Sequence, residues 1–303
     1  MRPLVLGTRG SALARRQAEL AVEALLRVGP DVEIETRVIR TEGDRRRDVP
    51  LEEIGGEGVF VKDIERRLAK GEIDLAVHSL KDMPAQTPEG LEIGAVLARG
   101  DPRDALVSRD GARLQSLPAG ARIGTDSRRR AVQLLALRPD VRPASIRGNV
   151  DTRLRKVAAG EYDAAVLAVA GLERLGLLRQ ASQLFSVDEL LPAVGQGALA
   201  VECRADDRET LALLALVDHK ETRLAVTAER AFLRRLGAGC RLPVGAYAEV
   251  ESGNLRLRAL MADESGSLHR AEASASTAQA ERLGSNLARR LMAATGPSAS
   301  LSR

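Results

Sequence analysis

Short apolar runs alternate with amphipathic segments along the first two thirds of the chain. An apolar run begins at Val5 and ends in a Gly-Thr turn, after which Ser11 is placed to cap a helix that reaches about Leu26. Further on, an amphipathic segment ends at Gly71 and a buried strand follows it. Strands that alternate with helices predict a largely parallel or mixed sheet that helices cover on both faces.

The same layout occurs twice. Ile123-Gly-Thr-Asp-Ser repeats the strand, the turn and the cap, so that Ser127 takes the position of Ser11. The run Gly-Glu-Ile-Asp-Leu-Ala-Val that starts at Gly71 returns as Gly-Glu-Tyr-Asp-Ala-Ala-Val at Gly160. Two similar α/β units are the simplest explanation. Ligands of such folds bind beyond the carboxyl ends of the strands, where helix N-termini gather.

The pattern changes at about Asp218. The elements predicted beyond it are a helix over 219–236, alternating strands around 245–250, 255–261 and 268–275, and a closing helix over 278–294. This order indicates a smaller third domain of the α+β class. Within the first unit, residues 41–58 are polar, rich in glycine and without periodicity. Such a long connection is either disordered or a lid, and its place near the predicted cleft favours a lid.

The amino-acid composition narrows the class of ligand that the protein is expected to bind. The 303 residues carry a formal charge of +4, and five of the 46 basic residues are Lys, which leaves 41 Arg. Arginine binds carboxylate or phosphate at two points. Only 2% of the residues are aromatic, which argues against a single-strand nucleic-acid binder that stacks bases. Another anion is therefore expected as the ligand.

The sequence also argues against a disulfide-rich, metal-binding, membrane-spanning or secreted protein. The two cysteines cannot form a disulfide framework, and no Cys-x-x-Cys or His-Glu-x-x-His spacing predicts a metal site. No run approaches the roughly 18 apolar residues of a membrane span, and the first residues are too weakly apolar for a signal peptide. We expect a cytoplasmic protein that binds neither membrane nor nucleic acid.

The two capped helix starts are candidate anion sites, because their free N–H groups carry partial positive charge. Arg9 stands beside the first cap, and residues 128–130, all Arg, stand beside the second. Ser11 and Ser127 could equally be ordinary caps. The repetition, with arginine beside both, favours two sites across one cleft.

Polar residues also follow the predicted strands. Ser79, Lys81 and Asp82 come at or just past the end of one strand, where an acid beside a base is a candidate for proton transfer. Three arginines that follow strand ends of the second unit are Arg147, Arg153 and Arg174. Like charges that gather in this way are costly unless a polyanion neutralises them.

The two cysteines differ in context. Cys203 lies within an apolar strand, which is typical of an inert small hydrophobe. Cys240 follows Gly-Ala-Gly in a loop and precedes Arg241, which favours the thiolate. Cys240 is therefore a candidate nucleophile or attachment point, with an inert thiol as the alternative.

Taken in order, these segments resemble the porphobilinogen deaminase (hydroxymethylbilane synthase) family over essentially the whole chain. The segments that carry the resemblance are Thr8-Arg-Gly-Ser-Ala-Leu-Ala, Gly58-Val-Phe-Val-Lys, Ala76-Val-His-Ser-Leu-Lys-Asp-Met-Pro, Arg103-Asp-Ala, Gly124-Thr-Asp-Ser, Arg147-Gly-Asn-Val-Asp-Thr-Arg-Leu, Leu167-Ala-Val-Ala-Gly-Leu, Leu191-Pro-Ala-Val-Gly-Gln-Gly, Ala228-Glu-Arg-Ala-Phe and Gly239-Cys-Arg-Leu-Pro. No single segment is decisive, but the ordered set is highly specific.

The resemblance implies a transferase of tetrapyrrole biosynthesis. Cys240 would carry a dipyrromethane cofactor through a thioether, four porphobilinogens would be added with loss of ammonia, and hydrolysis would release hydroxymethylbilane. Asp82 aligns with the family's catalytic carboxylate. The residues expected to bind the carboxylates of substrate and cofactor are Arg9, Ser11, Lys81, Ser127, Arg129, Arg130, Arg147, Arg153 and Arg174. Ser79, Thr125 and Gln196 are expected elsewhere in the cleft, and no metal is expected.

The resemblance also implies two domains similar to type II periplasmic binding proteins and a small α+β domain. The limits expected are 1–97 with 198–217 for the first domain, 98–197 for the second and 218–303 for the third. Residues 198–217 should rejoin the first sheet, and the family suggests a monomer. The chain departs from many relatives at Glu53 and Glu57, where they carry Lys, and at Arg128, where an apolar residue is common.

Rival interpretations come from other classes. A non-catalytic solute-binding or sensory domain for an acidic molecule also fits the duplicated pattern, but it needs neither Cys240 nor a third domain. A nucleic-acid binder is a weaker alternative, and a covalent enzyme that uses Lys81 is weaker still.

Overall fold

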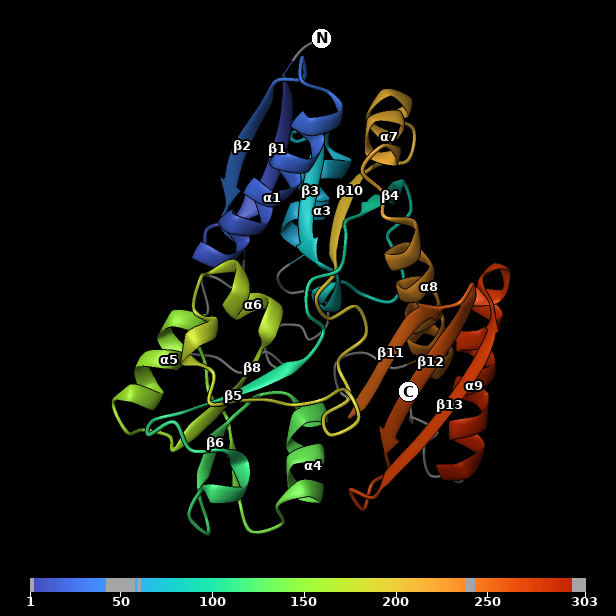
Figure 1. The fold of residues 1–303 in the computed structure, drawn as a ribbon. Coiled ribbons are helices and arrows are strands. Elements are labelled where there is room, and N and C mark those ends of the chain that lie inside the picture. The colour runs from blue at the N-terminus through green and yellow to red at the C-terminus, as the bar shows by residue number, and fades with distance from the viewer. Residues whose placement is uncertain (1–2, 42–57, 59–60, 238–242, 296–303) are drawn as a thin grey trace. The chain divides into compact units, whose positions relative to one another are not determined.

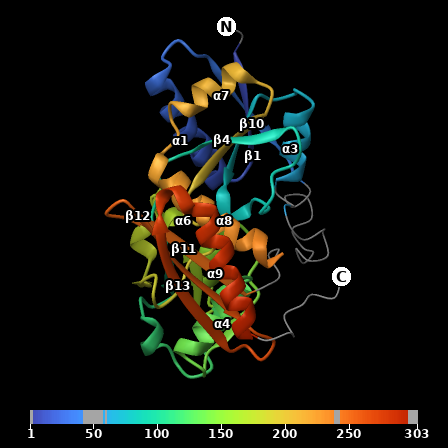
Figure 2. The same ribbon diagram turned by 90° about the vertical axis from the view of Figure 1, so that its right-hand side faces the viewer.

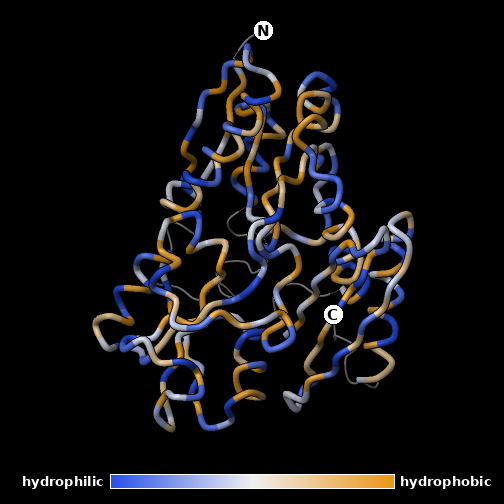
Figure 3. The backbone as a smooth tube through the Cα atoms, in the orientation of Figure 1, coloured by the Kyte–Doolittle hydropathy of each residue, from blue (hydrophilic) through white to orange (hydrophobic). Residues whose placement is uncertain are grey.

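The computed structural model describes residues 3–41, 58, 61–237 and 243–295. The chain forms two compact units (Figure 1). The first holds Met1–Gly100 and Gly197–Arg223, and the second holds Asp101–Gln196 and Leu224–Arg303. Along the helices, hydrophobic and hydrophilic residues alternate in short steps (Figure 3), as amphipathic helices on a protein surface require.

The first unit is built on a five-stranded sheet of order β2-β1-β3-β10-β4. Its strands are β1 (Leu4–Arg9), β2 (Ile34–Ile39), β3 (Leu75–Ser79), β4 (Leu91–Val96) and β10 (Leu199–Arg204). β1 pairs in parallel with β2 and β3, whereas β10 runs antiparallel between β3 and β4. After residue 197 the chain thus enters the first sheet again as β10.

Helices cover both faces of this sheet. They are α1 (Ala12–Val28), α3 (Lys62–Ala69) and α7 (Arg208–Ala215). Leu75 and Val77 pack with α1 and α7, while Ala76 packs with α3 on the opposite side. This alternation follows from the period of two along a strand.

The second unit begins with a sheet of order β7-β6-β8-β5-β9. Its strands are β5 (Asp104–Ser108), β6 (Arg122–Gly124), β7 (Arg142–Ala144), β8 (Ala164–Ala168) and β9 (Gln183–Leu184), and its helices are α4 (Arg128–Leu137), α5 (Val150–Ala158) and α6 (Val169–Arg174). β6 is parallel to β7 and β8, and β5 is antiparallel to β8 and β9. The two sheets therefore share one topology, with β5 in the place of β10.

The repeated Gly-Glu-x-Asp segment has the same role in both sheets. Gly71 and Gly160 adopt φ values of +70° and +77° at the helix ends, a region that favours glycine. The Asp74 carboxylate accepts a hydrogen bond from the Val5 N–H at 2.9 Å, and the Asp163 carboxylate accepts one from the Arg122 N–H at 2.7 Å. Each aspartate fastens the start of its strand to the neighbouring strand, which explains why the pattern occurs twice.

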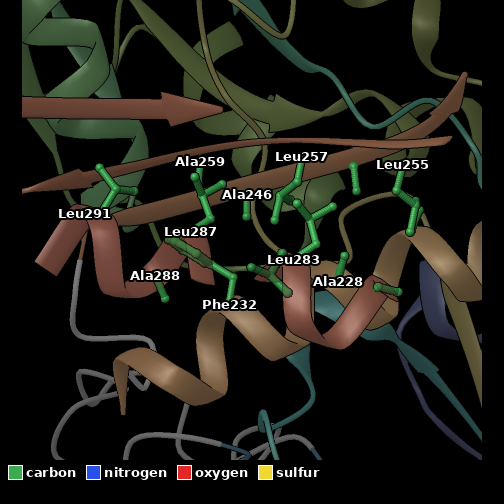
Figure 4. Close-up of a cluster of buried hydrophobic side chains, with 14 of the residues drawn as sticks. Ala228, Phe232, Ala246, Leu255, Leu257, Ala259, Leu283, Leu287, Ala288 and Leu291 are labelled. Atoms are coloured by element: carbon green, nitrogen blue, oxygen red, sulfur yellow. The ribbon is translucent and has the colours of Figure 1, made fainter. Parts of the chain in front are cut away.

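The second unit ends with a three-stranded antiparallel sheet and two helices. These are β11 (Val244–Glu251), β12 (Asn254–Ala262) and β13 (Leu268–Ser276) with α8 (Lys220–Leu236) and α9 (Ala280–Thr295). The sequence predicted all five elements to within about two residues at each end. Both helices lie on one face of the sheet (Figure 2). Phe232 of α8 and Leu287 of α9 lie between the helices and strand side chains such as Leu257 (Figure 4).

The expected fold class is confirmed: two duplicated α/β sheets are followed by a small α+β region. Short 3-10 turns complete the elements at Leu80–Asp82, Leu114–Ser116, Leu178–Gln180 and Thr277–Gln279. The exact domain limits stay a prediction.

Candidate functional site

In the first unit, five predicted site residues lie at one edge of the sheet. They are Arg9, Ser11, Ser79, Lys81 and Asp82, which end or directly follow the parallel strands β1 and β3. The Ser11 hydroxyl accepts a hydrogen bond from the Ala14 N–H at 3.2 Å and so caps α1 as predicted. The buried Thr8 hydroxyl donates to the Ala14 carbonyl at 3.0 Å, which ties this turn to the helix.

The turn with Asp82 is anchored behind its functional side chains. Gln17 of α1 donates to the Ser79 hydroxyl at 2.8 Å, and the Leu80 N–H donates to the Ala198 carbonyl at 3.1 Å. Leu80–Asp82 then form a 3-10 turn in which Leu80 is buried, Lys81 half-buried and Asp82 exposed. Within the described part of the chain, no ion pair engages Asp82. The Asp82 carboxylate is therefore accessible from solvent, and hydrogen bonds anchor the turn that carries it.

In the second unit, the cap at Ser127 repeats that at Ser11. The Ser127 hydroxyl accepts from the Arg130 N–H at 3.4 Å, and the Thr125 hydroxyl accepts from the Ser127 N–H at 3.2 Å. Thr125 is itself buried, and its N–H donates to the Ala144 carbonyl of β7 at 2.8 Å. The cap and the turn before it are therefore fixed to the sheet.

Arg129 and Arg130 point into the unit rather than into solvent. They are 4% and 7% exposed, and both form ion pairs with Asp104, which is fully buried at the start of β5. The shortest nitrogen–oxygen distances are 2.9 Å for Arg129 and 2.7 Å for Arg130. Gln196 also donates to Asp104, at 2.9 Å.

This cluster carries two guanidinium groups on one carboxylate. Burial lowers the pKa of Arg129 most strongly, and the neighbouring Arg130 lowers it further, whereas Asp104 raises it. Arg129 Nη1 donates to the Leu191 carbonyl at 2.7 Å, but among the described residues its buried Nε has no hydrogen-bond partner. The cluster therefore carries one positive charge more than its single carboxylate balances, and a carboxylate ligand supplies negative charge of this kind.

The other three arginines are all half-buried. Arg153 Nε donates to the Gly148 carbonyl at 2.9 Å, and Arg153 Nη2 lies 3.6 Å from Asp126. Arg147 precedes α5 in the same loop. Burial lowers the pKa of Arg174, the last residue of α6, to about 10. The structure thus brings Arg129 and Arg130 together on the carboxylate of Asp104.

Asp104 was not predicted from the sequence as a site residue, although Arg103-Asp-Ala contributed to the resemblance. The sequence feature that could have indicated Asp104 is an acidic residue at the start of an otherwise apolar strand. A second missed cluster is that of Glu65, His78 and Glu202, all buried in the first unit. His78 Nε2 lies 3.2 Å from Glu202 Oε2. Burial raises the pKa of Glu65 to about 7, and the charge of Glu202 contributes.

Glu65→Gln is expected to stabilise the protein at pH 8 and to change its stability little at pH 5. The folded protein holds a proton on Glu65 up to about pH 7, while the unfolded chain releases it near 4.5. The stability linked to this proton is present below the unfolded pKa and is lost as the pH rises through the folded pKa. A neutral amide avoids that loss, which is up to about 3 kcal/mol.

Thermal unfolding at both pH values measures the effect. Glu72→Gln is the control, because Glu72 is an exposed residue that pairs with Arg67 at 3.0 Å. An equal change in melting temperature at pH 5 and pH 8 for Glu65→Gln would show that Glu65 does not hold the proton.

Some predicted features lie outside the described residues. These are Cys240 and Arg241, Glu53 and Glu57, and nearly all of the segment 41–58 that was predicted to be a lid. Cys203 is fully buried in β10, and burial raises the pKa of its thiol to about 12. Its assignment as an unreactive thiol agrees with this environment.

The described residues contain neither a metal-binding cluster nor a membrane-spanning helix. No group of three or more His, Cys, Asp or Glu side chains there is arranged to hold a metal ion. None of the helices in that part of the chain has the length and apolar character needed to cross a bilayer.

Comparison with protein families gives two matches. Residues 4–212 match the model "Porphobilinogen deaminase, dipyromethane cofactor binding domain", and residues 223–293 match "Porphobilinogen deaminase, C-terminal domain". Curated relatives carry the same name. Porphobilinogen deaminase of Brevibacillus brevis is 55% identical over 82% of this chain and 80% of its own length. That of Syntrophus aciditrophicus is 49% identical over 95% of this chain and 94% of its own length.

The matches among solved structures have low TM-scores and share little sequence with this chain. The aliphatic sulphonate binding protein SsuA of Escherichia coli has a TM-score of 0.40 and 12% identity, over 77% of this chain and 70% of its own. YhfZ of Shigella flexneri has a TM-score of 0.37 and 18% identity, over 76% of this chain and 94% of its own.

Proposed function

The chain belongs to the porphobilinogen deaminase family, and we propose that it joins four porphobilinogen molecules head to tail on a dipyrromethane primer. Each addition releases one ammonia, and hydrolysis then frees the linear tetrapyrrole hydroxymethylbilane. The protein is accordingly a transferase of tetrapyrrole biosynthesis. The observation that carries the assignment of its binding region is the buried pair Arg129 and Arg130 on the single carboxylate of Asp104.

The described residues fit a dipyrromethane, the cofactor named for the domain that residues 4–212 match. Each ring of a dipyrromethane bears an acetate and a propionate, so the group brings four carboxylates. Arg129 and Arg130 exceed their shared carboxylate by one positive charge, and the buried Arg129 Nε lacks an acceptor among the described residues. When bound, the dipyrromethane supplies the covalent primer to which substrate is added.

Cys240 is proposed as the attachment point of that primer, through a thioether. The support is the contrast between the two cysteines: Cys203 is buried with a raised pKa, whereas Cys240 lies in the Gly239-Cys-Arg-Leu-Pro segment that carries the resemblance. The proposed third domain, residues 218–303, therefore holds the primer, and the domain of residues 98–197 holds five of the six arginines expected to bind carboxylates.

Asp82 is proposed as the catalytic group. Loss of ammonia from porphobilinogen leaves a cationic, electrophilic ring, and formation of the new carbon–carbon bond leaves a second cation until a ring proton departs. A carboxylate that faces pyrrole N–H groups stabilises both charges and can carry the proton away. The exposed position of Asp82 on an anchored turn suits this role.

The remaining predicted residues are proposed to hold carboxylates of substrate and growing chain. They are Arg9, Ser11, Lys81, Ser127, Arg147, Arg153 and Arg174. The N–H groups of α1 and α4 act with the Ser11 and Ser127 caps, because helix N-termini favour negative charge. Ser79 and Thr125 support these turns through the hydrogen bonds described above.

We further propose that the protein works as a cytoplasmic monomer without nucleic acid or membrane. The scarcity of aromatic residues supports the first exclusion. A single sedimenting species of about 32.4 kDa is the expected result, and a dimer would contradict the monomer.

An assay of ammonia tests the proposed function. The purified protein is expected to release one ammonia for each porphobilinogen consumed and to accumulate a linear tetrapyrrole. A protein that binds porphobilinogen without releasing ammonia would be a solute-binding protein, and the proposed function would then be wrong.

A further inference from the structure

Glu229 is a buried carboxylate that the proposed reaction does not use. It lies in α8 and is fully buried. Glu229 Oε2 accepts a hydrogen bond from the Gly195 N–H at 2.7 Å, and Oε1 accepts one from the Ala248 N–H at 2.9 Å. One side chain therefore joins α8, the segment before β10 and strand β11.

The hydrogen bonds continue from Gly195 to the arginine pair. The next residue, Gln196, is fully buried, and its Nε2 donates to the Pro102 carbonyl at 2.7 Å and to Asp104 at 2.9 Å. Asp104 in turn holds Arg129 and Arg130. A buried polar connection thus runs from the third sheet to the two arginines.

Backbone contacts lead from the third sheet to the same place. The Ala246 N–H of β11 donates to the Pro192 carbonyl at 3.2 Å. At Gly245, a Cβ atom would lie 2.8 Å from the Pro192 carbonyl oxygen and 3.2 Å from Arg129 Cδ. Glycine is required there for β11 to approach, and the approach places β11 directly against Arg129.

We propose that Glu229 and Gln196 are positioning residues that fix the third domain to the arginine pair, so that the primer can be assembled. The inference rests on the proposed function. α8 ends at Leu236 and β11 begins at Val244, so Glu229 holds both elements that flank Cys240 in the sequence. An attached group must reach Arg129 and Arg130 from that starting point, and small displacements of positioned groups are costly.

Glu229→Gln tests the inference. The amide oxygen of the new side chain can accept a hydrogen bond from one of the two N–H groups, Gly195 or Ala248. The amide NH₂ group then faces the other N–H donor, so one of the two hydrogen bonds is lost with little change in side-chain volume. Apoprotein is prepared from a host that cannot make porphobilinogen and is then incubated with porphobilinogen, and the dipyrrole on the protein is followed by intact mass. Loading is expected to be at least 10-fold slower at a temperature well below the melting temperature.

Two further variants separate positioning from stability. Glu272→Gln is the matched control, since Glu272 is an exposed glutamate of β13 that pairs with Arg256, and it should load at the wild-type rate. Gln196→Met keeps the volume but removes the link to Asp104, and it should slow loading as well. The double variant should be no slower than the slower single variant, because both interrupt one connection.

The outcomes distinguish the two proposals. If folded Glu229→Gln and Gln196→Met both load within twofold of the wild-type rate, the positioning role is wrong. If Glu229→Gln does not fold, Gln196→Met alone decides the inference in the same way. If the wild-type apoprotein acquires no dipyrrole, the proposed function itself fails.

Discussion

Asp82→Asn is expected to reduce turnover by about 10²- to 10⁴-fold while the protein stays folded, the range typical of a lost acid–base group. The amide keeps the volume of the side chain but removes the charge that stabilises the cationic substrate. The fold should persist because Asp82 is exposed and the turn is anchored through Ser79 and Leu80.

Steady-state consumption of porphobilinogen by loaded enzyme measures this effect, with thermal unfolding as the check on folding. Asp31→Asn is the control, since Asp31 is another exposed aspartate of the first unit. Turnover of Asp82→Asn within threefold of wild type would remove Asp82 from the catalytic role. If Asp31→Asn lost as much activity, the effect would not be specific to the turn after β3.

Cys240→Ala is expected to abolish both the cofactor and the activity, because without the thiol no thioether can form. The wild-type protein should exceed its sequence mass by one dipyrrole, and the variant should match its sequence mass. Cys203→Ala is the matched control. Its buried thiol has a pKa raised to about 12, so removing it should leave the cofactor in place and cost only some packing energy.

Intact mass spectrometry of the three proteins decides between these cysteines. A dipyrrole that remains on Cys240→Ala, or that is lost from Cys203→Ala, would contradict the assignment. Expression in a host that makes porphobilinogen is essential, since an apoprotein would mimic the loss.

Local pattern was enough to predict most of the fold. The capped helix starts at Ser11 and Ser127 depend on residues three positions apart, and the helix ends at Gly71 and Gly160 depend on a single glycine each. The duplication was visible because the two halves keep the same short motifs. The family resemblance, and not periodicity, led to the expectation that residues 198–217 rejoin the first sheet, and the place of β10 between β3 and β4 came only from the structure.

The partners of buried charges were not predictable in this way. Arg130 meets Asp104 across 26 positions, Glu229 meets Gly195 across 34, and His78 meets Glu202 across 124. The sequence placed Arg129 and Arg130 beside a helix cap without indicating their burial, whereas the sheet places β5 beneath α4 and so buries both side chains. Long-range pairing of this kind follows from topology, which the residues near each charge do not encode.

A mass ladder on the protein tests the central claim most directly, namely that porphobilinogens are added one at a time to a primer on Cys240. Enzyme that carries the dipyrrole is mixed with limiting porphobilinogen and quenched in acid, and its mass is measured by intact mass spectrometry. The account predicts species that exceed the loaded enzyme by one, two, three and four units of porphobilinogen less ammonia, and none of them on Cys240→Ala. Tetrapyrrole that forms in solution while the mass of the protein never changes would contradict it.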